Sequence, residues 1–235
     1  DGFEALWPGK FTQAELKKRL REEGWYHFSA QYMNDPVPSE DAVFRRDWIQ
    51  YYESPDTKGK IFNKFMAVDP ALSTSKEADY TAMMVVGIDE YGYFYILDIL
   101  RRRMSPSDVI DEIFRMRETW NLVDIGMEQV AFQKTLAYAL RDDPRFKLRP
   151  FHVTELKPND RTKDQRIRAL QPLYENGKIL HNKNLMNNVY LEDELTRFPR
   201  SRHDDLIDAL SYCLDFAFPA RQVSRSKHSK KRYLY

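Results

Sequence analysis

Acidic residues stand at three places where the surrounding sequence is apolar. Asp69 directly follows the apolar run 65–68, and Glu128 follows a second apolar run. Asp205 lies in His203-Asp-Asp-Leu-Ile-Asp-Ala209, which opens an apolar stretch with the pattern of a packed helix. A carboxylate beside a buried segment is costly unless it is paired, hydrogen-bonded or bound to a cation. These three places are therefore candidates for chemistry.

Taken singly, each acid has an ordinary structural explanation. Asp69 and Glu128 can cap the turns that follow their strands. Acids at a helix N-terminus are stabilised by the helix dipole, which accounts for Asp204 and Asp205. The same explanation fits Asp208 poorly, because that residue lies in an otherwise apolar part of the helix.

Taken together, the acids indicate a metal centre. Three or four close carboxylates repel one another unless cations neutralise them. Oxygen ligands without cysteine or clustered histidine select Mg²⁺ or Mn²⁺ over zinc. Two such ions about 3.5–4 Å apart suit phosphodiester hydrolysis. The pattern therefore predicts a centre with two divalent cations, and a single-ion site or a purely structural acid cluster is the alternative.

The segments that must position these acids alternate between strand and helix patterns. Apolar runs and turn signals predict strands at residues 65–68, 81–88, 93–100, 122–127, 149–153 and 178–181. Caps and apolar periodicity predict helices at residues 106–120, 132–140, 162–177, 184–195 and 204–218. Three strands followed by alternating helices and strands predict an α/β fold. This is the order of an RNase H-like fold, a central mixed β-sheet flanked by helices on both faces, and many other α/β folds share it.

The chain divides into three regions. Residues 1–60 are rich in aromatic side chains and open with a helix that begins at the capping box Thr12-Gln-Ala-Glu15. Within them, the turn-rich stretch 34–40 is typical of a connector. Residues 61–218 carry the strands and helices. Residues 219–235 contain lysines and arginines without an acid, which predicts a mobile basic tail.

The composition limits the classes of protein that remain. The chain has 235 residues, of which 42% are hydrophobic, enough for one domain with a core. Lysine and arginine number 37 against 36 acids, so a nucleic-acid partner must be argued from local clusters. The single Cys213 suits a reducing compartment. Without a membrane-length apolar run, a signal peptide or an initial Met, we expect a piece of a longer cytoplasmic protein.

Three motifs resemble those of the large terminase subunit of bacteriophages. Phe65-Met-Ala-Val-Asp69-Pro-Ala, with Ala78-Asp-Tyr-Thr81, is similar to the family's first nuclease motif. Gly126-Met-Glu128-Gln is similar to its second acidic motif, and residues 203–209 resemble the last. The segment 28–38, with the aromatic residues up to 52, resembles the connection from the family's ATPase domain to its nuclease domain. The resemblance implies that residues 1–60 are a connecting segment from an absent ATPase domain. The resemblance covers nearly the whole chain.

The resemblance implies a metal-dependent endonuclease that cuts double-stranded viral DNA concatemers. Cleavage would have little sequence specificity and occur at the initiation and termination of genome packaging, and ATP hydrolysis would belong to a missing upstream domain. Carried over by motif, Asp69, Glu128 and Asp205 would be the catalytic residues and the ligands of two Mg²⁺ or Mn²⁺ ions. Further metal candidates in the same motifs are Asp204 and, more weakly, Asp208 and Asp79.

Basic residues near the acids are candidates for phosphate contacts, which need no base-specific code. The predicted DNA-binding residues are Arg197, Arg200, Arg202, Lys163, Arg166, Lys134 and Lys76. For Arg101-Arg-Arg103, we expect a solvated face instead.

The resemblance also implies partners and a location. In the full-length protein these would be the portal, the small terminase subunit and other copies of the large subunit, with no membrane. The protein would act in the cytoplasm of the infected bacterium and transiently at the procapsid portal. Two alternatives remain: a nuclease like Holliday-junction resolvases or transposases, and a catalytically silent DNA-binding or assembly platform. The first shares the fold and the acids but leaves the connecting segment unexplained.

Overall fold

The computed structural model describes residues 42–70, 80–128, 131–156 and 162–220, together with residues 12, 14–16 and 18–19 near the N-terminus. The side chains of Glu128 and of residues 131–135 lie outside that description.

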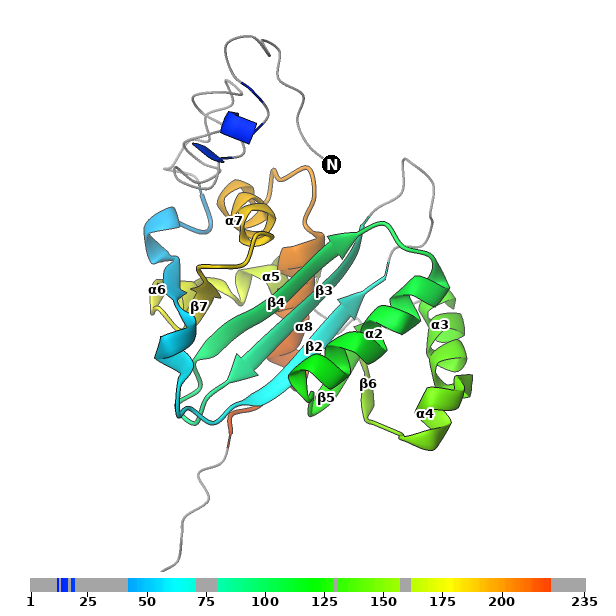
Figure 1. Cartoon of the computed structure of the whole chain (residues 1–235). Helices are drawn as coiled ribbons and strands as arrows, with labels where there is room; N and C mark the ends of the chain where they lie inside the picture. Colours follow the sequence, from blue (N-terminus) through cyan, green and yellow to red (C-terminus); the bar gives the residue numbers. More distant parts are fainter. Residues whose placement is uncertain are drawn as a thin grey trace, which may run out of the picture.

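A mixed seven-stranded sheet forms the centre of the molecule (Figure 1). Its strands are β1 (Gln50–Tyr52), β2 (Asn63–Asp69), β3 (Thr81–Ile88), β4 (Phe94–Arg102), β5 (Asp124–Glu128), β6 (Val153–Leu156) and β7 (Ile179–Asn182), in the spatial order β1-β7-β4-β3-β2-β5-β6. Strands β2, β3 and β4 form an antiparallel meander. Beside β2, strands β5 and β6 continue the sheet in parallel, and β7 and β1 do so beside β4.

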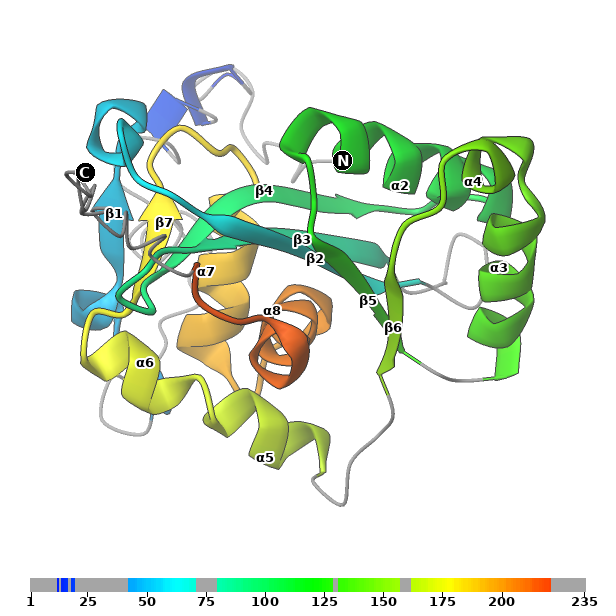
Figure 2. The same cartoon turned by 90° about the horizontal axis from the view of Figure 1, so that it is seen from below.

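Helices cover both faces of this sheet (Figure 2). On one face lie α2 (Pro106–Trp120) and α3 (Ala131–Asp142), and on the other lie α5 (Lys163–Arg168), α7 (Asn188–Arg197) and α8 (Asp205–Phe216). The shorter helices are η1 (Arg46–Trp48), η2 (Ser54–Thr57), α4 (Pro144–Leu148) and α6 (Gln171–Glu175). The predicted α/β class, a mixed sheet between two layers of helices, is confirmed.

Two apolar cores lie on the two faces of the sheet. Alternate residues of a strand point to opposite faces. Phe65 and Ala67 accordingly join the core on the α8 side, whereas Met66 and Val68 join the core on the α2 side. Asp69 continues the alternation of Phe65 and Ala67, and β2 therefore delivers its carboxylate to the α8 side.

Two predicted helix starts are confirmed with their caps. Ser105 Oγ accepts the backbone N–H of Asp108 at 3.2 Å, and Pro106 occupies the first helical position of α2. Thr162 Oγ1 accepts the backbone N–H of Gln165 at 3.3 Å at the start of α5. In each case a side chain bonds a backbone donor that the helix itself leaves without a partner.

The bounds of the strand predicted at residues 149–153 are wrong. Strand β6 begins only at Val153, and the unpredicted helix α4 precedes it at residues 144–148. Asp143 caps α4 by accepting the backbone N–H of Arg145 at 2.8 Å, and Pro144 takes the first helical position. The sequence Asp-Pro carried this helix-start signal.

The helices around β7 also differ from their predicted ranges. The helix expected at 162–177 is divided into α5 and α6, and Pro172 stands in the first turn of α6, where its missing N–H does no harm. Helix α7 begins at Asn188 rather than at 184. Asn187 makes no cap there, because its side chain donates to the carbonyl oxygen of Ile99 in β4 at 2.7 Å.

Part of the predicted connecting segment lies within the sheet domain. Strand β1 pairs in parallel with β7, and the side chain of Phe44 is buried at the edges of the rings of Tyr174 and Phe198. The division of the chain at residue 60 stays a prediction, but residues 44–52 share the core of the strands that follow them.

The capping box near the N-terminus falls partly on described residues. There the backbone N–H of Glu15 donates to Thr12 Oγ1 at 3.2 Å. The turn-rich stretch 34–40 and residues 221–235 of the predicted basic tail lie outside the described residues. In the part of the chain that the structure describes, no helix has the length and apolar character needed to cross a membrane.

Candidate active site

Asp69 and Glu128 end two neighbouring parallel strands. Strands β2 and β5 pair in the register Val68↔Met127, and the two acids follow at adjacent positions on the same edge of the sheet. The side chain of Glu128 lies outside the described residues, so only its place at the end of β5 is known. The strand ends predicted to carry these acids are therefore neighbours.

The register of the sheet places a cation in the same row as Asp69. Ala82 is directly opposite Asp69 on one side and directly opposite Arg101 on the other. Residues directly opposite one another in antiparallel pairs share a face of the sheet. Arg101 therefore lies on the α8 side, the side to which Asp69 points.

Arg101 lies between two acids and two aromatic rings. Its Nε is 3.7 Å from Glu194 Oε1 and 3.9 Å from Asp205 Oδ2. Its guanidinium carbon is 4.0 Å from the ring centre of Tyr80 and 5.3 Å from that of Tyr190. Only 9% of the side chain is exposed. The expectation of a solvated face is therefore wrong for Arg101.

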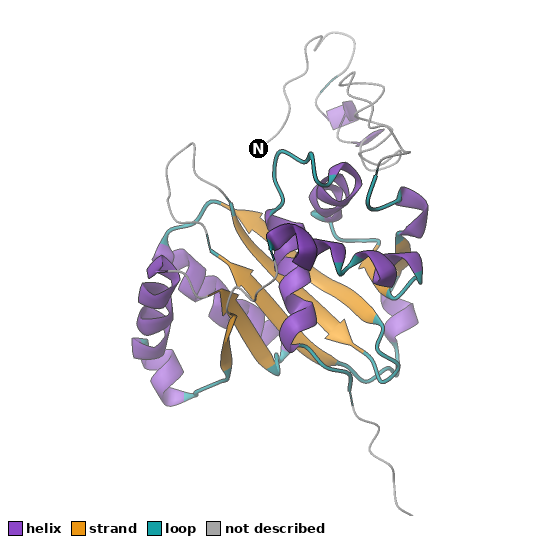
Figure 3. Ribbon diagram, turned by 180° about the vertical axis from the view of Figure 1, so that it is seen from behind, coloured by secondary structure: helices purple, strands orange, loops and turns teal. Residues whose placement is uncertain are grey.

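Glu194, on α7, bonds the first turn of α8. Its Oε2 accepts the backbone N–H groups of Leu206 at 2.8 Å and of Ile207 at 3.0 Å. Burial raises the pKa of Glu194 to about 8; the charge of Asp205 adds to that rise, while the backbone hydrogen bonds and Arg101 oppose it. Figure 3, which views the sheet from behind, shows the helices that cover this face.

Lys163, the first residue of α5, lies among carboxylates. Its Nζ is 2.8 Å from Asp204 Oδ1 and 3.4 Å from Asp208 Oδ2. Burial alone would lower the pKa of Lys163, but the charges of Asp208, Asp204 and Asp69 outweigh it and raise that pKa above its usual value. Carboxylates from β2 and from the start of α8 thus converge on one ammonium group.

Asp208 forms a buried ion pair with Arg166. The Nη2 and Nε atoms of Arg166 lie 2.6 and 3.1 Å from Asp208 Oδ1, and Nε also donates to Ser211 Oγ at 3.2 Å. The guanidinium stacks on the ring of Tyr212 at 3.9 Å. Both charged side chains are less than a tenth exposed. Asp208 and Arg166 thus form an ion pair with a structural role, buried where α5 packs against α8.

The other predicted DNA-binding residues have different environments. Arg200 and Arg202 are exposed in the loop between α7 and α8. Arg197, at the end of α7, is partly buried, and its Nε lies 2.6 Å from Asp193 Oδ1. Lys76, Asp79 and the side chain of Lys134 lie outside the described residues. Of the predicted set, Arg200 and Arg202 are thus the exposed arginines that directly precede the acids of α8.

Two residues of this site, Arg101 and Glu194, escaped the sequence reasoning. Arg101 stands two positions after Ile99, an apolar residue of the α8 side, so strand alternation offered a signal for its direction. Glu194 gave no such signal, because an acid in a helix is ordinarily solvent-exposed.

The donor groups gathered here are oxygen atoms of carboxylates. Among the residues whose side chains are described, no three His, Cys, Asp or Glu side chains lie close enough together to hold one metal ion. Glu128, one of the three predicted ligands, falls outside that set. The assignment of Asp69, Glu128, Asp205 and Asp204 as ligands therefore stays a prediction.

Comparison with known proteins identifies the family. The family model described as a terminase RNaseH-like domain matches residues 66–215, and no curated protein matches the chain. A mutant nuclease domain of the large terminase subunit gp2 of bacterial virus Sf6, with manganese and beta-thujaplicinol, superposes with a TM-score of 0.51 and 14% identity, over 74% of this chain and 98% of that chain. The HK97 bacteriophage large terminase has a TM-score of 0.50 and 12% identity, over 73% of this chain and 43% of that chain.

The large terminase nuclease from thermophilic phage G20c with bound zinc has a TM-score of 0.49 and 18% identity, over 72% of this chain and 85% of that chain. At such identities the Sf6 and HK97 structures establish the RNase H-like fold alone. The family model, in contrast, spans more than half of the chain and includes Asp69, Glu128 and Asp205. This chain therefore belongs to the terminase RNase H-like domain family.

Proposed function

We propose that this chain is a metal-dependent endonuclease domain that cleaves double-stranded viral DNA concatemers, with little sequence specificity, when genome packaging starts and ends. The observation that carries the proposal is the position of three acids. Asp69 and Glu128 end neighbouring strands, and Asp205 begins the helix that packs on the same face.

The proposed cofactors are two divalent cations, Mg²⁺ or Mn²⁺. Asp69, Glu128 and Asp205 would hold them, with Asp204 beside them. The all-oxygen donor set fits hard cations, and the ammonium of Lys163 among Asp69, Asp204 and Asp208 is a cation already stabilised at this place. Manganese accompanies the Sf6 relative. Bound at such a site, divalent cations make water a better nucleophile and stabilise the leaving oxygen of a phosphodiester.

The chain's own residues would bind and orient the DNA. Arg200 and Arg202 are exposed directly before the acids of α8 and would contact phosphates. Lys163 would contribute a third positive charge when it turns away from Asp204. Arg166 is buried against Asp208, and we propose no phosphate contact for it while that pair is intact.

Assembly with the portal, the small terminase subunit and other copies of the large subunit is part of the proposal for the full-length protein. So is its location in the cytoplasm of the infected bacterium and at the procapsid portal. Translocation driven by ATP would belong to another domain.

A nicking assay tests this function. The protein is incubated with supercoiled plasmid and Mn²⁺ or Mg²⁺, with and without a chelator, and compared with Asp69→Asn and Asp205→Asn. We expect metal-dependent nicking that both substitutions abolish. The control Asp215→Asn changes an exposed acid of the same helix and should cut normally.

The same assay separates the alternatives. A resolvase-like enzyme would cut a four-way junction and leave linear and supercoiled duplex intact. A silent platform would retain plasmid in a gel without cutting it under any metal. If Asp205→Asn nicks plasmid at the wild-type rate, the assignment of the site is wrong.

A further inference from the structure

We propose that Glu194 is a positioning residue that fixes the start of α8, and thereby the carboxylate of Asp205, relative to β2. The inference rests on the proposed function for the role of Asp205. It concerns a residue on α7 that lies outside the three acidic motifs.

The first turn of α8 is capped from another helix. A helix leaves its first backbone N–H groups without an internal partner, and a side chain at the N-cap ordinarily accepts from one of them. Asp204 stands at the N-cap of α8 but makes no such bond, and its carboxylate turns to Lys163. Oε2 of Glu194 accepts the N–H groups of Leu206 and Ile207 in its place.

Capping by Glu194 frees the side chain of Asp204. If Asp204 itself capped α8, its carboxylate would be bound to the backbone of its own helix. Because Glu194 supplies the cap, the Asp204 carboxylate can face Lys163 and the proposed metal site. The carboxylates of Asp204 and Asp205 at the start of α8 are also stabilised by the helix dipole.

The second oxygen of Glu194 extends the same arrangement to Asp205. Oε1 lies 3.7 Å from Arg101 Nε, and that nitrogen lies 3.9 Å from Asp205 Oδ2. Glu194 and Asp205 thus flank one guanidinium, which the rings of Tyr80 and Tyr190 hold. Glu194 is only 2% exposed, so its carboxylate is fixed by packing as well as by hydrogen bonds.

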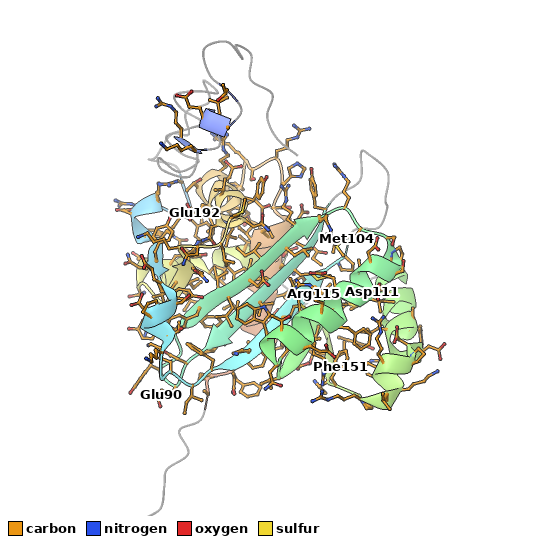
Figure 4. All side chains as sticks on the ribbon, in the orientation of Figure 1. Glu90, Met104, Asp111, Arg115, Phe151 and Glu192 are labelled. Carbon is orange, nitrogen blue, oxygen red and sulfur yellow. The ribbon has the colours of Figure 1, made fainter. Side chains whose placement is uncertain are left out.

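Glu192 provides a matched control on the same helix. It is also buried, and Figure 4 labels it among the side chains around α7. Its oxygens face η1, β1 and β7. Tyr51 Oη donates to Oε1 at 2.8 Å, and His181 Nδ1 lies 3.6 Å from the same oxygen. Arg46 Nη2 lies 3.6 Å from Oε2. Loss of Glu192 would therefore weaken the seating of α7 without removing the cap of α8.

The test compares Glu194→Ala, Glu194→Gln and Glu192→Ala in two measurements. The first is hydrogen exchange at the amides of Leu206 and Ile207. The second is the dependence on Mn²⁺, given by the concentration for half-maximal binding in calorimetry and, separately, by the concentration for half-maximal plasmid nicking. In Glu194→Ala we expect both amides to exchange at least about tenfold faster, and the required Mn²⁺ to rise about tenfold or more, as for other residues that orient metal ligands.

Glu194→Gln keeps an acceptor oxygen for the two N–H groups, so we expect it to retain most amide protection. Glu192→Ala should lose thermal stability with little change in either measurement. If Glu194→Ala does not fold, Glu194→Asp replaces it, since the shorter side chain keeps a carboxyl group but cannot reach both N–H groups.

The inference is overturned if a folded Glu194→Ala or Glu194→Asp protein keeps wild-type amide protection and Mn²⁺ dependence. It is equally overturned if Glu192→Ala changes the Mn²⁺ dependence as much. Failure of the proposed function has a different signature: the wild-type protein then binds no Mn²⁺ and cuts no DNA. In that case unchanged amide exchange in Glu194→Ala still refutes the cap.

Discussion

Replacing Asp208 by alanine tests the buried ion pair that joins α5 to α8. The substitution removes the carboxylate that lies 2.6 Å from Nη2 of Arg166, while Ser211 Oγ and the ring of Tyr212 stay beside the guanidinium. Because Arg166 is only 7% exposed, water cannot readily replace the lost partner. Lys163, also near Asp208, is about two-fifths exposed and can turn to solvent.

The expected loss of stability follows from that burial. Removing one partner of a buried ion pair costs about 3–5 kcal/mol, because the other charge remains uncompensated. For a chain of this size each kcal/mol shifts the melting temperature by about 2–4 °C, so a fall of roughly 6–20 °C is expected. The double variant Asp208→Ala with Arg166→Met should be more stable than Asp208→Ala alone, because it removes the buried cation together with the carboxylate.

Urea denaturation and thermal melting, both followed by circular dichroism, measure the free energy of unfolding and the melting temperature. The matched control is Asp164→Ala, which removes the carboxylate 2.7 Å from Arg168 Nε on the solvent side of the same helix α5. Both side chains of that pair are more than two-fifths exposed, and its loss should cost less than about 1 kcal/mol. The reasoning fails if Asp208→Ala is no more destabilising than Asp164→Ala, or if the double variant is the least stable of the set.

Three further outcomes are expected. Gly126→Ala should destabilise the fold by about 1–3 kcal/mol in the same urea assay, because its Cβ would lie 2.6 Å from the ring of Phe216; wild-type stability would contradict the close packing. The thiol of Cys213 is fully buried, and burial raises its pKa to about 12, so we expect no reaction with a disulfide reagent at pH 8 before unfolding. Fast labelling of the native protein would contradict that prediction. Mn²⁺ should raise the melting temperature of the wild-type protein more than that of Asp205→Ala, and equal shifts would place the ion elsewhere.

The local signals of the sequence predicted much of the sheet and several helices. Strand β3 was predictable with its bounds, because a strand covered on both faces reads as one continuous apolar run. The caps at Ser105 and Thr162 were predictable because each side chain bonds a backbone N–H only three residues further along the chain. Helix α4 was missed although Asp143-Pro144 carries a helix-start signal. The start of α7 was not predictable, because it depends on a hydrogen bond from Asn187 to β4.

For the acids too, the sequence determined the local position and the tertiary structure determined the partners. By itself, the sequence determined that Asp69 and Glu128 end apolar strands and that Asp205 begins an apolar helix, because these are properties of neighbouring residues. Only the tertiary structure decided which charges meet. Asp208 pairs with Arg166 from another helix, and Arg101 from β4 and Glu194 from α7 flank the start of α8. The physical reason is that a buried charge requires a counter-charge or hydrogen-bond partner in space, and the packing of distant elements chooses that partner.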